Sequence, residues 1–146
     1  MHKLGFGGFS TTWLARDIKA ARYVAIKISV AEAGYPPEGE ILRRLGKSKS
    51  GPESCPGNAV IPPVLDEFNV KGPNGTHRCL VTAPARMSIA ESRDTSDLRI
   101  FQLPVARAIA AQLVQAIAFV HSFGVLHSGI HWSPAFLCLN TANYYV

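Results

Sequence analysis

The sequence LGFGGFS (residues 4–10) is followed, one strand's length later, by VAIK (residues 24–27), and this pairing decides the fold. A turn of glycines leaves backbone N–H groups bare, so that they can close over phosphate oxygens. A lysine at the end of the next apolar strand supplies a point charge for the same phosphates. Glycine-rich turns alone are common and are usually only turns. The lysine at strand spacing makes a nucleotide site the preferred interpretation.

The spacing of apolar residues along the chain predicts the strands and helices that surround this pairing. β-Branched and aromatic residues after the glycines predict strands, and the apolar residues at 41, 42 and 45 share one face of a short helix. A second, longer helix has one apolar face, made by Val105, Ile109, Leu113, Ile117 and Val120. The expected elements are strands over 11–15 and 23–28, a helix over 38–46 ended by Gly46, a loop over 47–60, a hairpin of strands 64–70 and 78–82, and a helix over 104–123 ended by Gly124.

The glycine stretch and the lysine resemble those of eukaryotic protein kinases. Residues 4–17 resemble the phosphate-covering loop of the SR-protein kinases and their fungal relatives, which carry a serine, here Ser10, in place of the third glycine. The resemblance implies an α+β, protein kinase-like fold. Residues 1–85 would form the five-stranded antiparallel N-lobe with one helix and the hinge, and residues 86–146 the incomplete start of a helical C-lobe.

The resemblance also implies an ATP site. Lys27 would hold the phosphates, and a helical glutamate would orient it; Glu40 is the preferred partner by its position in the pattern, and Glu38 is the alternative. Residues 80–85 resemble the hinge between kinase lobes, with Thr82 as gatekeeper. The implied ATP-binding residues are Leu4, Gly5, Phe6, Gly7, Gly8, Phe9, Ser10, Thr12, Ala25, Lys27, Glu40, Ala83 and Ala85.

The segment HSGIHWSP (residues 127–134) resembles the kinase catalytic loop, but no catalytic residue is intact. His127 is retained, whereas Gly129 replaces the proton-accepting aspartate, His131 a lysine, and Pro134 the metal-binding asparagine. The sequence ends at Val146 before any Asp-Phe-Gly. We therefore expect a truncated chain that binds ATP weakly, takes Mg²⁺ only with the nucleotide, and is inactive in phosphoryl transfer. The two histidines lack a third nearby ligand, so no metal site is expected.

The amino-acid composition limits the classes of binding partner and the cellular compartment that we expect. The chain has 146 residues and a formal charge of +5, but its basic residues are scattered, so no nucleic-acid partner is expected. Three widely spaced cysteines without a Cys-x-x-Cys pair favour a reducing compartment, hence an intracellular protein, cytoplasmic or nuclear. Arg107, Gln112 and Gln115 interrupt the longest apolar stretch, so no membrane span is expected.

Two alternatives to an ATP-binding kinase domain stay open. One is a pseudokinase-type scaffold that binds a protein partner on the exposed apolar face of the 104–123 helix. The other is a gene fragment without a function of its own.

Overall fold

The computed structural model of the chain describes residues 1–31, 38–47, 56–85 and 88–125. The chain divides into two compact units. The first, here the sheet unit, consists of residues 1–44 and 62–84, and the second, the helical unit, of residues 45–61 and 85–146.

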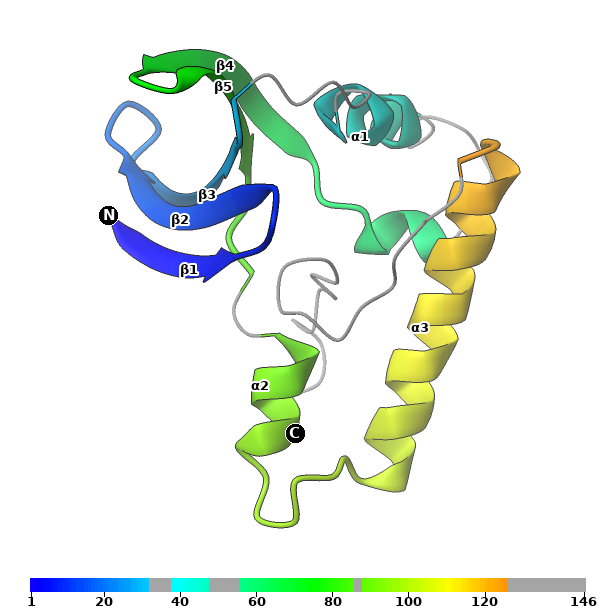
Figure 1. Ribbon diagram of the computed structural model, residues 1–146. Helices are drawn as coiled ribbons and strands as arrows, with labels where there is room; N and C mark the ends of the chain where they lie inside the picture. The colour runs from blue at the N-terminus through cyan, green and yellow to red at the C-terminus, as the bar shows by residue number, and fades with distance from the viewer. Residues whose placement is uncertain (32–37, 48–55, 86–87, 126–146) are drawn as a thin grey trace. The chain divides into compact units, whose positions relative to one another are not determined.

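The sheet unit contains one five-stranded antiparallel sheet with the strand order β1-β2-β3-β5-β4 (Figure 1). Its strands are β1 (His2–Phe6), β2 (Ser10–Asp17), β3 (Arg22–Ser29), β4 (Val64–Gly72) and β5 (Gly75–Thr82). The predicted five strands with one helix after the third are confirmed. The β4–β5 hairpin is tighter than expected, because Gly72 pairs with Gly75, whose φ of 120° only glycine adopts readily.

The core of the sheet unit lies on the two central strands, β3 and β5. Val24 and Ala25 on β3, and Cys79, Leu80 and Val81 on β5, are all buried. Consecutive buried residues, rather than alternating ones, indicate a strand covered on both faces. Burial raises the pKa of the Cys79 thiol.

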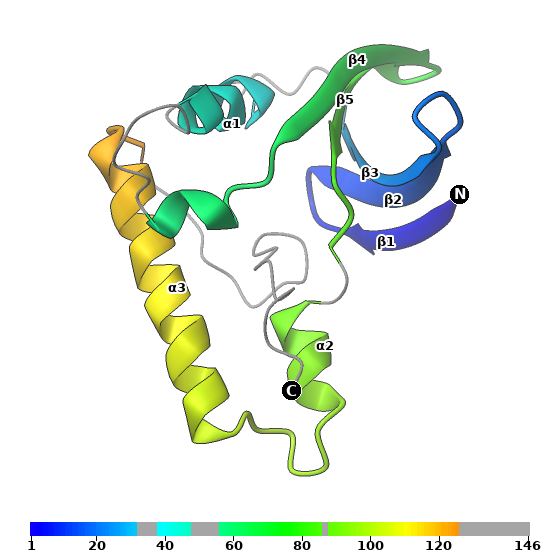
Figure 2. The ribbon, with the colours of Figure 1, turned by 180° about the vertical axis from the view of Figure 1, so that it is seen from behind.

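Helix α1 (Glu38–Lys47) follows β3 in the chain (Figure 2). Side-chain ion pairs link it to β3 and β4. Gly46 lies inside this helix, so the prediction that it ends the helix was wrong by one residue. A glycine in the last turn weakens a helix without stopping it.

The helical unit contains η2 (Pro56–Val60), α2 (Ile89–Asp94) and α3 (Leu103–Ser122). Helix α3 packs on η2, a 3-10 turn inside the stretch predicted as loop. A Cβ on Gly57 would come within 2.1 Å of the backbone oxygen of Gln115, so only glycine fits there. Ala116 and Phe119 are the buried residues of α3, and the expected end at Gly124 is confirmed by its φ of 69°.

Helix α2 begins with a capping box. The backbone N–H of Glu91 donates to the Ser88 hydroxyl at 3.0 Å, and the backbone N–H of Ser88 donates to the Glu91 carboxylate at 2.9 Å. Hydrogen bonding to the Glu91 carboxylate from Ser88, first from its backbone N–H and then from its side chain, holds the pKa of Glu91 below its usual range.

Most of the expected apolar face of α3 is only half-buried, and Leu103, Val105 and Val114 are exposed. We expected Arg107, Gln112 and Gln115 to leave no stretch that is long and apolar enough to span a membrane, and this expectation was wrong. Helix α3 reaches a mean hydropathy of 1.6 over a window that is 11% buried, which is long and apolar enough to cross a bilayer. A single such helix is weak evidence for a span, because core helices of other proteins pass the same test.

Candidate functional site

The glycine turn, residues 5–9, joins β1 to β2. The Gly7 N–H donates to the Ser10 carbonyl at 2.9 Å and closes the turn. A Cβ at Gly5, Gly7 or Gly8 would meet nothing within 4 Å, and none of the three has a positive φ. Among the described residues, neither packing nor backbone conformation requires glycine here. The bare backbone instead leaves room for a group from outside the chain.

Two phenylalanines flank the glycines. Phe6 and Phe9 are 73% and 67% exposed, and the Lys3 ammonium lies 4.2 Å from the Phe6 ring centroid. The Val30 N–H donates to the Phe9 carbonyl at 2.9 Å, which ties the turn to the end of β3. Leu4 falls at a register irregularity of β1 and is partly exposed.

One row of directly opposed residues crosses the whole sheet and connects the turn to the lysine. Residues opposite each other on antiparallel strands point to the same face. From β1 to β4, this central row consists of Gly5, Thr12, Lys27, Leu80 and Glu67. The fold therefore brings three predicted site residues, Gly5, Thr12 and Lys27, together on adjacent strands.

Lys27 pairs with Glu38, the alternative that the sequence left open. Its Nζ lies 2.6 Å from Glu38 Oε2, and the two side chains are 17% and 46% exposed. Glu40, the preferred candidate, lines a surface pocket beside Arg43 instead. The structure thus corrects the partner of Lys27 from Glu40 to Glu38.

Helical geometry explains this correction. Residues two positions apart in an α-helix point about 200° away from each other around the helix axis. Glu38 and Glu40 therefore cannot both face the sheet. Glu38 precedes Leu42 and Leu45 by four and seven residues, the spacing of a single helix face. Leu45 is only 2% exposed and Leu42 is half-buried, whereas Glu40 is exposed. Glu38 therefore shares a helix face with the buried Leu45, and from this face its carboxylate reaches Lys27.

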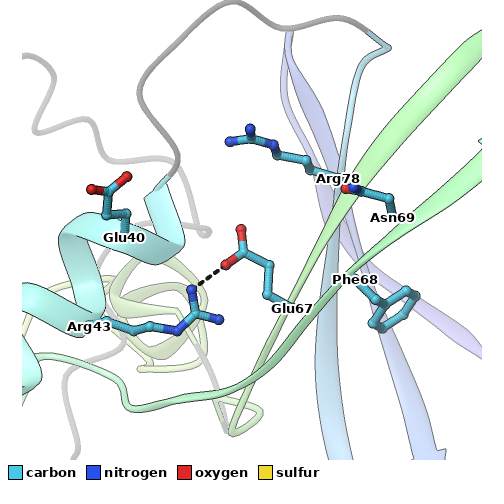
Figure 3. A pocket seen from close by; sticks show the side chains of 6 residues that line it. All are labelled: Glu40, Arg43, Glu67, Phe68, Asn69 and Arg78. Carbon is cyan, nitrogen blue, oxygen red and sulfur yellow. Dashed lines mark hydrogen bonds and ion pairs between the residues drawn. The ribbon is translucent and has the colours of Figure 1, made fainter.

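A second ion pair attaches α1 to the other end of the central row. Arg43 Nη1 lies 2.5 Å from Glu67 Oε2 (Figure 3). Gly39, one turn before Arg43, is buried, and a Cβ there would lie 2.6 Å from the same oxygen. The missing side chain leaves the space that the Glu67 carboxylate fills. Sequence reasoning missed both Arg43 and Glu67, since nothing local relates residues 24 positions apart.

The predicted hinge begins where β5 ends. Ala25, which is buried, lies opposite Thr82 across the β3–β5 ladder. Ala83 and Ala85 are exposed, and the strand stops before Pro84, which has no N–H to continue it. The fold brings Ala25 and Thr82 together, while the contacts assigned to Ala83 and Ala85 stay predictions.

The degenerate catalytic loop lies outside the described residues. This applies to each member singled out from the sequence, namely His127, Gly129, His131 and Pro134. Within the described ranges, no three His, Cys, Asp or Glu side chains gather closely enough to hold a metal ion.

Known proteins similar to this chain are protein kinases. It is 30% identical over 122 residues to a serine/threonine protein kinase of Aspergillus fumigatus, covering 84% of this chain. It is 33% identical to protein kinase dsk1 of Schizosaccharomyces pombe and 28% identical to human SRSF protein kinase 3, covering 94% and 97% of this chain. The chain spans only 25–30% of the length of these relatives. No protein-family model matches it.

A solved structure confirms the fold class. The crystal structure of a kinase domain matches with a TM-score of 0.61 at 19% identity, over 84% of this chain and 34% of that one. The predicted resemblance to SR-protein kinases and fungal serine/threonine kinases is likewise confirmed.

Proposed function

The chain is a relative of the serine/threonine protein kinases of the SR-protein kinase group, and from this premise we propose that its sheet unit binds ATP. The glycine turn contacts the phosphates through backbone N–H groups, and Lys27 contacts them with its ammonium. Magnesium enters with the nucleotide. No other metal site forms part of the proposal.

The geometry of Lys27 is the observation that carries this proposal. Its side chain is 17% exposed, and Glu38 holds it at 2.6 Å, so a long flexible ammonium has a fixed position. It stands two strands from Gly5 in the central row. Adjacent strands lie about 4.8 Å apart, so turn and ammonium are within the span of one triphosphate.

We place the adenine subsite at the C-terminal end of β5, beside Thr82. Ala25 is small and buried opposite Thr82. Ala83, which is exposed, supplies a backbone carbonyl for the base. In this proposal Glu38, rather than Glu40, orients the lysine.

A nucleotide-binding titration tests the proposal. The melting temperature of the chain is measured against the Mg²⁺ complex of adenylyl imidodiphosphate, since a ligand that binds only the folded state raises it. Lys27→Ala should abolish the shift. Lys19→Ala removes the same charge from an exposed turn and should leave it unchanged. Equal shifts for wild type and Lys27→Ala would refute the role of Lys27.

We further propose that the bound nucleotide is not efficiently used for phosphoryl transfer. At the positions that resemble the catalytic loop, Gly129 has no side chain to accept a proton and Pro134 has no amide oxygen for a metal ion. Incubation with radiolabelled ATP and an Arg/Ser-rich peptide tests this. Multiple turnovers by the wild-type chain, absent in Lys27→Ala, would contradict it.

A protein-binding scaffold is the second candidate, favoured by the exposure of α3. Leu103 is 61% and Val114 65% exposed, which is unusual for large apolar residues on one helix. Light scattering after gel filtration tests it. Binding of a hydrophobic dye provides a second measurement. If the wild-type chain is monomeric and binds no more dye than Val114→Glu does, the result would speak against this candidate. For either function we propose an intracellular location, which a fluorescent fusion would test.

A further inference from the structure

A polar pocket of about 530 Å³ lies between α1 and the β4–β5 hairpin, on the sheet unit alone. It is lined by Glu40, Arg43, Glu67, Phe68, Asn69 and Arg78. Figure 3 shows the Phe68 ring turned away from the other five side chains, which end in charged and amide groups.

Strand register explains why these groups converge. Asn69 lies directly opposite Arg78, and Glu67 lies two residues before Asn69, so all three side chains are on the same face of the sheet. Glu67 belongs to the central row, and the Asn69–Arg78 pair lies two residues along from it. Arg43 reaches the same place from α1 through its ion pair with Glu67.

The pocket contains hydrogen-bond donors that no residue of the described chain uses. No hydrogen bond or ion pair joins the Arg78 side chain to another residue within the described part of the chain. Arg43 commits Nη1 to Glu67 and keeps further N–H groups. In Figure 3 the Glu67 carboxylate lies between the two guanidinium groups, and Glu40 adds a second carboxylate to the lining.

We propose that this pocket binds an oxyanion carried on a peptide, either a carboxylate or a phosphoryl group. The planar guanidinium of Arg78 presents paired N–H groups to such an anion, and the Asn69 amide lies beside it. Glu40 at the rim opposes binding, but it is exposed and largely screened by solvent. This site is separate from the proposed ATP site and does not depend on it.

Fluorescence anisotropy with labelled peptides that differ only in their central residue tests the proposal without nucleotide present. Phosphoserine and glutamate identify the source of the anion, and glutamine serves as the neutral control. Arg78→Gln should weaken binding of the anionic peptide by about tenfold or more, as expected for losing a charge-assisted hydrogen bond. Arg44→Gln removes the same charge from an exposed residue of α1 outside the pocket, and should change binding less than about twofold.

A third variant gives an effect in the opposite direction. Glu40→Gln removes the opposing charge and should tighten binding by about two- to threefold at low salt. Equal losses in Arg78→Gln and Arg44→Gln would overturn the proposal, because attraction would then follow net charge alone. Equal binding of the neutral peptide, or preference for a lysine-centred peptide, would also overturn it. All variants change exposed side chains, and unchanged melting curves verify their folding.

Discussion

The ion pair between Lys27 and Glu38 can be distinguished from a pair with Glu40 by two double-mutant cycles. The first combines Lys27→Met with Glu38→Gln, and the second combines Lys27→Met with Glu40→Gln. A cycle subtracts every other contact that each side chain makes and leaves only the coupling between the two. The structure predicts coupling in the first cycle and none in the second.

The size of the coupling follows from the exposure of the partners. Exposed ion pairs contribute about 0.2–1 kcal/mol, and hydrogen bonds to charged groups about 1.5–3 kcal/mol. Lys27 is 17% exposed and Glu38 46%, at a separation of 2.6 Å, so the pair lies between these classes. We expect a coupling of about 1 kcal/mol for Lys27 with Glu38, and less than about 0.3 kcal/mol for Lys27 with Glu40.

Urea unfolding followed by tryptophan fluorescence measures the free energy of unfolding of each variant. Glu38→Gln and Glu40→Gln each remove one negative charge, so the two cycles differ only in the position of that charge on α1. High salt should reduce the first coupling only partly, since Lys27 is mostly buried. A coupling for Glu40 as large as that for Glu38 would refute the assignment of α1's inner face.

Three further predictions concern other elements. Gly57→Ala should lower the free energy of unfolding by about 2 kcal/mol or more through its clash with α3, whereas Gly46→Ala, which meets nothing within 4 Å, should raise it by about 0.5–1 kcal/mol; urea titration compares the two. Ser88→Ala should raise the pKa of Glu91, measured by NMR titration. Because folding lowers that pKa, the stability it contributes is present above the unfolded-state pKa and is lost as the pH falls through the folded-state value, so the two proteins should differ least in acid. Cys79, kept as the sole cysteine, should react with a thiol reagent at pH 8 far more slowly in native than in unfolded protein, and equal rates would contradict its burial.

The order of strands and helices could be predicted because each element has a local signal. Alternating and β-branched residues mark the strands, and the glycine at 124 marks the end of α3. The spacing also placed Lys27 correctly on a strand that follows the glycine turn, and the register aligns it with Gly5 across β2. The η2 turn was missed, since Pro and Gly in residues 56–60 are as common in loops as in 3-10 turns.

The partner of Lys27 could have been chosen from the sequence, and the second ion pair could not. Glu38 stands at helical spacing from the apolar residues of α1, a signal outweighed by the position of Glu40 in the family pattern. Arg43 and Glu67 meet only because β4 pairs with β5 in one register. Such a contact depends on tertiary structure, and a single sequence carries no local trace of it.

The two ion pairs of α1 have opposite polarity. The helix offers an anion to Lys27 on β3 and, five residues later, a cation to Glu67 on β4. Five residues of helix rise about 7.5 Å, and two strand spacings measure about 9.6 Å, so both contacts can form at once. If the helix lay in the reverse direction, Glu38 would face Glu67 and Arg43 would face Lys27, with like charges opposed at both ends. The two ion pairs therefore select one direction of α1 on the sheet. In this direction the charges attract at both contacts, and in the reverse direction they repel at both.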